Sequence, residues 1–508
     1  MAVPLIYIFR RAFDGGIGSY LDLVISAQTG GLLIRTLLLV AGVVGVSLII
    51  ALPLAWLVAR TDLPGRRFFA VAGALPLVFP SYIAAFSLVA VAGPRGYLQG
   101  WLQQFGVERL PEVAYGYSGA VLALAPFIYP YVYLLVVSML RELDPALEES
   151  AESLGLGRWR TFFAVVLPQL RPAILSGSLL VALYTLSDFG AVSIVRYNTF
   201  TMSIYDAYRA MFDRAAAAAL STVLVAVTVI FIAGEFALLR RMRASRVRAA
   251  RPPRRIRLNG WRIPSLIFVC GVMMLSLILP LGTIFYWLVR GLSSGRAVNI
   301  LMQPIAGSLS SAAAAAGVAV LLAIFPAIWS VRHSGILARL TERLIYGGYA
   351  LPGIVIALAL VFFVARNVYP LYQTFALLVI AYVIRFLPEA VAATRSALLA
   401  VSPAFEEAAR SLGRSPFQVI REVTFPMLRK GLLAGGGLVF LTSMKELPAT
   451  LILRPLGFET LATRIWTAAS EAYYSEAAIY ALLLIAFSAV PVYLLVIQPS
   501  LAEGKGRS

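Results

Sequence analysis

Long apolar stretches make up most of the chain, and short polar segments separate them. Eleven of these stretches approach or exceed the roughly 20 residues that a helix needs to cross a bilayer. They lie at 37–59, 68–92, 119–140, 174–195, 216–239, 264–289, 308–331, 344–364, 375–399, 431–453 and 477–496. The pattern predicts an all-α polytopic membrane protein with about eleven spans.

Two polar interruptions, at 144–175 and 402–433, are copies of each other. A shift of 258 positions places the first on the second without a gap. The matched pairs are Pro145 with Pro403, Glu148 with Glu406, Glu149 with Glu407, Ala151 with Ala409, Gly155 with Gly413, Pro168 with Pro426, and Arg171 with Arg429. The duplication predicts a first repeat at 1–239, a basic linker at 240–262 and a second repeat at 263–508.

Each interruption is expected to form two helices joined by a turn. In the first copy Asp144 suits the position before a helix, and the proline after it is tolerated in the first turn. Gly155 lies where a glycine commonly ends a helix. Pro168 predicts a turn or kink before the next apolar segment. The second copy carries the same signals.

The repeats also suggest how the chain begins. A shift of 276 positions places 75–76 on 351–352 and 4–5 on 280–281, both as Leu-Pro or Pro-Leu pairs. Because Pro280 lies in the middle of the sixth span, the first repeat is expected to begin partway through the counterpart of that span. A longer reading frame should then encode a twelfth span.

Composition and charge agree with a membrane protein. Hydrophobic residues make up 60% of the chain and charged residues 13%, and the mean hydropathy is +0.85. Such a chain has more apolar surface than a soluble protein of this size can bury. The net charge of +19 would also fit nucleic-acid binding, but the basic residues concentrate in the linker and on the side that holds both interruptions. The positive-inside rule therefore predicts that both interruptions and the C-terminus lie in the cytoplasm. The linker is expected to face anionic lipid, and no nucleic-acid partner is expected.

Candidate catalytic chemistry is sparse. The single cysteine, Cys270, allows no intrachain disulfide, and the single histidine, His333, lies in a short basic loop. No G-x-x-x-x-G-K-[ST] phosphate loop occurs, and no group of His, Cys or carboxylates has the spacing of a metal site. We therefore expect no enzyme and no cofactor in this chain, and a separate subunit must supply any energy.

The two interruptions resemble the EAA loop of ATP-binding-cassette (ABC) importer permeases, in which E-A-A is followed after three residues by G and after nine more by I-x-L-P. The second copy departs from this pattern at two conservative positions, and the first has Ser150 for the middle alanine. The matching segments are 149–151, Gly155 and 165–168 in the first copy and 407–409, Gly413 and 423–426 in the second.

This resemblance implies the type I ABC importer permease fold, with two bundles related by a pseudo-two-fold axis, in the bacterial inner membrane. In that family each EAA loop docks on one ATPase subunit, which binds the ATP. Two ATPase copies and an extracytoplasmic substrate-binding protein are thus the expected partners. The expected coupling residues are Glu148, Glu149, Ala151, Gly155, Pro168, Glu406, Glu407, Ala409, Gly413 and Pro426. For each glutamate, a first-turn role toward the helix dipole is the alternative.

A second set of candidates lies inside the spans. Asp188 and Glu446 share the 258 offset, and an acid inside a span usually faces a cavity or a partner. Lys445 is placed to neutralise Glu446, and Arg385 with Glu389 forms a one-turn pair. A transport gate and a structural ion pair are both compatible with this pattern. The pathway candidates are Tyr184, Asp188, Arg385, Glu389, Lys445 and Glu446.

The cargo is suggested by resemblance alone. The stretches 75–86, 187–191 and 199–214 are similar to the ferric iron branch of fused permeases. Thiamine, phosphonate and polyamine permeases share much of the layout and stay as alternatives. A secondary transporter is the alternative of another class, since it too has repeats and midplane acids but needs no twin docking loops.

Overall fold

The computed structural model describes the chain as helices joined by short connections. The residues described are 2–94, 96–105, 113–241, 255–293, 301–333, 351–399 and 402–492, with single positions between 334 and 350. Within this part the one extended pairing is a parallel bridge between Thr61 and Ile256. The predicted all-α fold is confirmed.

The chain packs as two compact units. Unit 1 comprises 1–20, 213–222 and 295–508, and unit 2 comprises 21–212 and 223–294. Each unit takes in helices from outside the repeat that supplies most of it. Helix α1 (Ala2–Ala12) packs against α19 (Gly353–Asn367) in unit 1, and α16 (Leu279–Ser293) packs against α5 (Ser81–Ala92) in unit 2. The repeat boundaries read from the sequence are a different division and stay a prediction.

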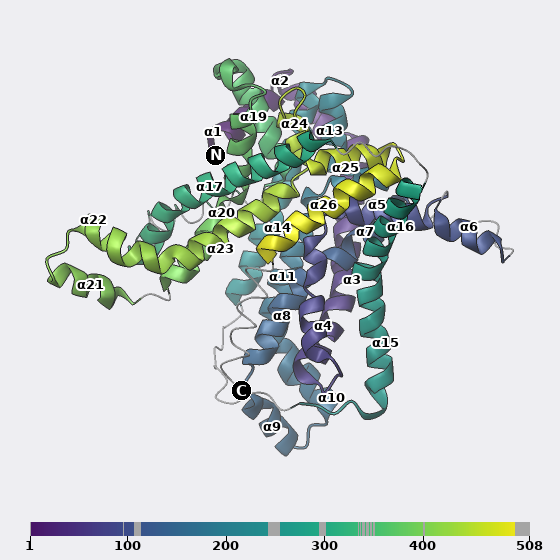
Figure 1. Ribbon diagram of the computed structural model, residues 1–508, viewed down its shortest axis with the longest axis vertical. Helices are drawn as coiled ribbons and strands as arrows, with labels where there is room; N and C mark the ends of the chain where they lie inside the picture. Colours follow the sequence, from purple (N-terminus) through teal and green to yellow (C-terminus); the bar gives the residue numbers. More distant parts are fainter. Residues whose placement is uncertain are drawn as a thin grey trace. The chain divides into compact units, whose positions relative to one another are not determined.

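Three helices form the centre of each unit. In unit 2 they are α3 (Ala27–Arg60), α8 (Pro130–Glu142) and α11 (Leu167–Ser187), and in unit 1 they are α17 (Met302–Arg332), α20 (Phe375–Leu399) and α23 (Phe425–Met444). Figure 1 shows α17, α20 and α23 side by side, with α21 (Pro403–Ser411) and α22 (Pro416–Val419) at one end of them. The same figure shows α9 (Pro145–Ser153) and α10 (Arg158–Thr161) at one end of α8 and α11.

The remaining helices flank these bundles or connect their members. They are α2 (Gly16–Val24), α4 (Arg66–Ala72), α6 (Tyr97–Gln103), α7 (Gly116–Ile128), α12 (Gly190–Ile194), α13 (Phe200–Arg209), α14 (Arg214–Arg241), α15 (Arg262–Met273), α24 (Pro448–Leu453), α25 (Leu461–Ser470) and α26 (Tyr474–Val492).

A matched glycine lets the central helices cross closely in both units. A Cβ atom on Gly177 of α11 would lie 2.7 Å from the Cα atom of Val132 in α8. A Cβ atom on Gly435 of α23 would lie 2.9 Å from the Cα atom of Ala390 in α20. Both residues of the second crossing lie 258 positions after those of the first. The duplication therefore extends from the loops into the packing of the bundles.

Eight helices of the described part are long and apolar enough to span a membrane, or nine if one bent pair counts as a span. These eight match eight of the predicted spans. The stretch 68–92 instead forms a helix pair bent by 95°, and 344–364 overlaps the 15-residue helix α19, which begins at Gly353. The stretch 431–453 is divided between α23 and α24. Hydropathy alone does not reveal such breaks, because the residues on both sides are apolar.

The structure corrects the 276-position register. Helices α5 and α19 each begin directly after a proline, Pro80 or Pro352, and these prolines lie 272 positions apart. The residues at 75–76 instead belong to a 3-10 turn before α5. Similar letters at 75–76 and 351–352 therefore suggested the wrong correspondence.

Candidate functional site

Both EAA loops begin with a capped helix, as predicted. The Oδ1 atom of Asp144 accepts a hydrogen bond from the backbone N–H of Ala146 at 3.0 Å, at the start of α9. The hydroxyl of Ser402 accepts one from the N–H of Ala404 at 3.3 Å, at the start of α21. These side chains satisfy backbone donors that the first helical turn leaves free.

The predicted glycine turns are also present. Gly155 and Gly413 adopt the left-handed region, with φ of +83° and +81°. After Gly155, the N–H of Leu156 donates to the carbonyl of Ala151 at 3.1 Å, and the equivalent bond in the second loop measures 3.2 Å. This is the Schellman ending, for which glycine is preferred because a Cβ is strained at positive φ.

No turn forms at Pro168 or Pro426. Each lies in the first turn of α11 or α23, directly after a π-helical segment at Phe162–Val166 or Ile420–Thr424. A π-helical turn widens the backbone next to a proline, which lacks an N–H and crowds the preceding turn. The first of these helices therefore continues unbroken over 29 residues, to the end of α11.

The outward faces of the two loops carry the same kinds of side chain at matched positions. Leu154 is 83% exposed and Leu412 is 82% exposed. The exposed pairs are Glu149 with Glu407, Leu154 with Leu412, and Trp159 with Phe417. Ala151 and Ala409 lie on the opposite, buried face. These exposed apolar side chains, at matched positions on two otherwise polar loops, make this face the candidate contact surface.

Glu148 and Glu406, which directly precede the exposed Glu149 and Glu407, point inward. Glu148 forms an ion pair with Arg60, the last residue of α3, through both carboxylate oxygens. Glu406 forms an ion pair with Arg332, the last residue of α17, with 2.9 Å between Oε1 and Nη2. The hydroxyl of Thr424 also donates to Glu406 Oε1 at 3.1 Å. Sequence reasoning missed both pairs because their members are far apart in the chain.

A second candidate site lies where spans break. Asp188 follows the end of α11, and its Oδ1 accepts a hydrogen bond from the N–H of Ala191 in α12 at 2.9 Å. Glu446 follows the end of α23, and its Oε1 accepts one from the N–H of Ala449 in α24 at 3.0 Å. Both acids therefore cap the short helix that continues each span. Broken helices of this kind line ligand pathways in many transporters.

Each of these acids meets the start of another helix. Ser81, the first residue of α5, hydrogen-bonds to Asp188. In the second repeat the Nη1 atom of Arg385 donates to Glu446 Oε1 at 2.9 Å. Gly353, the first residue of α19, leaves room for that guanidinium, because a Cβ there would lie 1.6 Å from Arg385 Nη1.

Of the other pathway candidates, Tyr184 lies on α11, Glu389 lies on α20 and Lys445 directly follows α23. Lys445 interacts electrostatically with Glu389. In the first repeat Tyr131 occupies the position that matches Glu389, and its ring lies 6.1 Å from that of Tyr184. Among the residues described, no group of three His, Cys, Asp or Glu side chains has the arrangement of a metal site.

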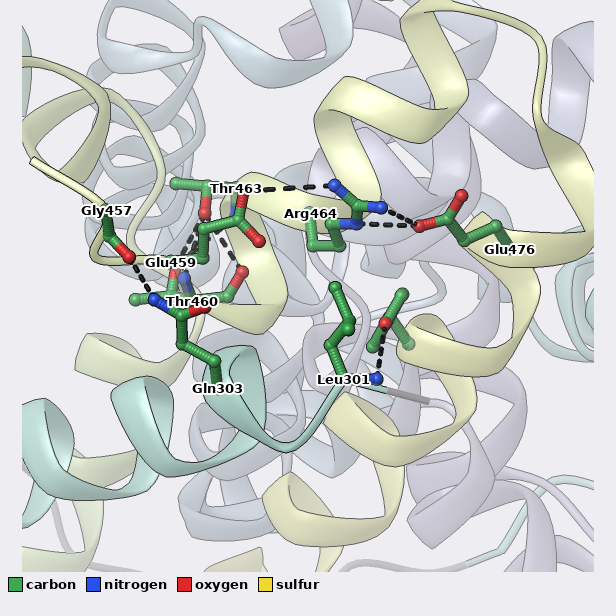
Figure 2. Close-up of polar contacts among 9 residues, drawn as sticks. Leu301, Gln303, Gly457, Glu459, Thr460, Thr463, Arg464 and Glu476 are labelled. Atoms are coloured by element: carbon green, nitrogen blue, oxygen red, sulfur yellow. Dashed lines mark hydrogen bonds and ion pairs between the residues drawn. The ribbon is translucent and has the colours of Figure 1, made fainter. Parts of the chain in front are cut away.

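A polar cluster fixes α25 in unit 1 (Figure 2). Thr460 and Thr463 form a reciprocal capping box at the start of α25, with N–H to hydroxyl distances of 3.0 and 3.3 Å. The Nε atom of Arg464 donates to Glu476 Oε1 at 2.6 Å, and its Nη1 lies 3.8 Å from Glu459. Burial alone would lower the pKa of Arg464, but these two carboxylates raise it above its ordinary value.

The loop before α25 is tied to the start of α17. Gln303 donates a hydrogen bond to the carbonyl of Gly457, as Figure 2 shows. In the same loop Leu456 is 88% exposed. The loop therefore presents an exposed leucine on a fixed backbone, at the other end of the unit 1 bundle from α21 and α22 (Figure 1).

Comparison with known proteins gives one family. Residues 47–244 and 319–499 both match the family described as binding-protein-dependent transport system inner membrane component, so each match contains one EAA loop.

Several permeases are similar to the chain. It is 35% identical to the Fe(3+)-transport system permease protein FbpB 2 of Haemophilus influenzae, over 97% of this chain and 95% of that protein. It is 33% identical to the sulfate transport system permease protein CysT of Escherichia coli, over 36% of this chain and 67% of that protein. The molybdenum transport system permease protein ModB of Escherichia coli is 36% identical over 27% of this chain and 58% of its own length.

Proposed function

Because the chain belongs to the family of binding-protein-dependent transport system inner membrane components, we propose that it is the permease of an ATP-driven importer, with both halves in one chain. The observation that carries this proposal is the pair of EAA loops, which expose an acid, a leucine and an aromatic side chain at matched positions in one chain. Two matched surfaces suit two copies of one partner. The partner is an ATPase subunit, which binds and hydrolyses the ATP, and an extracytoplasmic binding protein delivers the cargo.

The exposed face of each loop is the proposed docking surface. Covering Leu154 and Leu412 removes apolar area from water, and full burial of a leucine is worth about 1.5–3 kcal/mol. Glu149 and Glu407 lie on the same helices and can pair with basic groups of the ATPase. The helix caps, the glycine turns and the buried alanines hold this surface in shape.

The proposed orientation places both EAA loops, the basic linker and the C-terminus in the cytoplasm. It follows from the concentration of Lys and Arg on that side. The linker then lies beside the anionic lipid of the inner leaflet. Residues 242–254 and 493–508 are outside the described part of the chain, so this proposal rests on their sequence.

Ferric iron is the proposed cargo. Its support is the likeness to FbpB 2, which extends over nearly the whole of both chains, whereas the sulfate and molybdenum permeases match about a third of this one. The binding protein carries the selectivity for the ion in this proposal. The permease then needs a path and no chelating site of its own.

The test is uptake of radiolabelled ferric iron into proteoliposomes that hold the permease, its ATPase and its binding protein. We expect uptake that needs ATP and that thiamine, a phosphonate, spermidine and sulfate leave unchanged. Leu154→Asp combined with Leu412→Asp should release the ATPase and lower uptake by about tenfold or more. Leu456→Asp, an equally exposed leucine at the opposite end of the bundle, is the matched control for docking and should leave the ATPase bound.

Two results would contradict this proposal in different ways. Entry of a competitor without entry of iron would reject the cargo and keep the importer. Iron uptake that is driven by an ion gradient and needs no ATPase would favour the secondary transporter instead.

A further inference from the structure

The coupling helices α9 and α21 are joined to the long spanning helices by one ion pair each. Arg60 ends α3, and Arg332 ends α17. Their partners, Glu148 and Glu406, lie in the first turns of α9 and α21. Otherwise α9 packs chiefly on α10 and the π segment that follows it, which are its own continuation along the chain.

Both ion pairs are shielded from water. The side chain of Arg60 is 2% exposed and that of Glu148 is 19% exposed. The corresponding values are 16% for Arg332 and 10% for Glu406. A charge in such a place is costly to leave without its partner, so each pair resists separation.

Apart from Glu148, few groups stabilise the charge of the Arg60 guanidinium. Its Nε and Nη1 atoms have no hydrogen-bond partner among the described residues, and its guanidinium lies 5.6 Å from the ring centre of Trp56. Glu148 is therefore the acceptor on which its orientation depends. The carbonyl of Arg60 also accepts a hydrogen bond from the N–H of Ile256 at 2.8 Å, so the end of the linker is attached at the same point.

The two pairs are not produced by copying a single segment. Glu148 and Glu406 lie 258 positions apart, whereas Arg60 and Arg332 lie 272 positions apart. The two halves thus make the same contact although the chain between its members differs in length. The arginine ends a long helix of the central bundle each time, about 51 Å of helix in α3 and about 46 Å in α17 at 1.5 Å per residue.

We propose that the ion pairs Arg60–Glu148 and Arg332–Glu406 are the positioning contacts through which movement of the ATPase-bound EAA loops reaches the spanning helices. This inference rests on the proposed function, because it assumes an ATPase on α9 and α21. Glu148 and Glu406 then do not contact the ATPase. They fix the first turn of each coupling helix to the end of a spanning helix, so α3 and α17 follow when the loops are displaced.

The test uses the complete transporter in proteoliposomes. Glu148→Gln combined with Glu406→Gln removes both charges and keeps the side-chain shape. The first readout is co-purification of the ATPase, and the second is the stimulation of ATP hydrolysis by the loaded binding protein, which must pass through the permease but needs no cargo to cross. The third is iron transported per ATP hydrolysed. Glu142→Gln, an exposed glutamate at the end of α8 and outside the EAA loop, is the matched control.

We expect the ATPase to co-purify with the double variant and the unstimulated rate of ATP hydrolysis to stay the same. Stimulation and transport per ATP should both fall by roughly fivefold or more, as for loss of a coupling free energy. Exchanging the charges, with Arg60→Glu and Glu148→Arg together, should restore about half or more of the stimulation that Arg60→Glu alone removes. A merely structural role would lower protein yield and leave these ratios unchanged.

Three outcomes would overturn the proposal. The first is unchanged stimulation in the double glutamine variant, and the second is an exchanged pair that hydrolyses ATP without recovering stimulation. The third is loss of the ATPase from the double variant, which would make the glutamates docking residues. A wild-type permease that never binds the ATPase would instead reject the proposed function, so the two failures are distinguishable.

Discussion

The ion pair between Arg385 and Glu446 allows its two interpretations to be separated by removing one charge at a time. The side chain of Glu446 is 5% exposed and that of Arg385 is 17% exposed, so neither regains much hydration when its partner is lost. Arg385→Gln leaves a buried carboxylate and should destabilise unit 1 by about 3–5 kcal/mol. Glu446→Gln keeps an amide oxygen for the N–H of Ala449 but removes the carboxylate charge opposite the guanidinium, so its cost should be of the same order.

The double variant, with glutamine at both positions, carries neither charge of this pair. Its free energy of unfolding should lie within about 1–2 kcal/mol of the wild-type value, because two amides can hydrogen-bond to each other in the same place. The assay is unfolding in mixed detergent micelles with rising SDS, analysed as a double-mutant cycle. Arg414→Gln is the control, since its pair with Glu422 is about half exposed and should be worth less than about 1 kcal/mol. Additive losses in the cycle would refute the reasoning.

Transport by the same variants then distinguishes a structural pair from a gate. If the pair only supports the fold, the double variant should recover uptake together with stability. If the two charges line the path of the cargo, stability should return while uptake stays low. Protein level must be matched across the variants before either conclusion is drawn.

Two further predictions concern single positions. Gly177→Ala should cost about 1–3 kcal/mol, because its new Cβ would lie 2.7 Å from a backbone carbon of α8, whereas Gly45→Ala meets nothing within 4 Å and should cost nothing in the same unfolding assay. Burial raises the pKa of Asp206, so the folded state favours the protonated carboxyl. The stability that this protonation adds to the fold is present at low pH and is lost as pH rises through the folded-state pKa. Asp206→Asn should therefore raise Tm at pH 7 and leave it unchanged near pH 3, and an equal gain at both values would contradict this.

The sequence predicted best what is decided within a few residues. The cap at Asp144 depends on a hydrogen bond to a residue two positions away, and the turn at Gly155 depends on one backbone dihedral. The duplication also made each such prediction twice. The turn predicted as one alternative at Pro168 was wrong, because the π segment before it lets the helix continue where a proline signal alone suggests a turn.

The contacts that form the candidate sites were beyond sequence reasoning. Arg60 and Glu148 lie 88 positions apart, and Arg385 and Glu446 lie 61 apart. Nothing in the spacing of such residues distinguishes a partner from any other opposite charge. The broken span at 431–453 was missed for a related reason, since a window of apolar residues has the same hydropathy whether its helix is continuous or not.

The two repeats break their spans at matched places, but different groups contact the acids there. In the first repeat the acid is held by Ser81, whereas in the second repeat Gly353 has no side chain and leaves the space to Arg385. The residue at the start of α5 or α19 therefore decides which group fills the site. Gly353→Ser alone should displace the guanidinium and destabilise unit 1.

Gly353→Ser combined with Arg385→Phe transplants the arrangement of the first repeat, in which Phe127 matches Arg385. A hydroxyl can then donate to Glu446, so the double variant should be more stable than Gly353→Ser alone in the same unfolding assay. An equal or greater loss would show that the guanidinium itself is needed there, and that the two breaks are alike in backbone only.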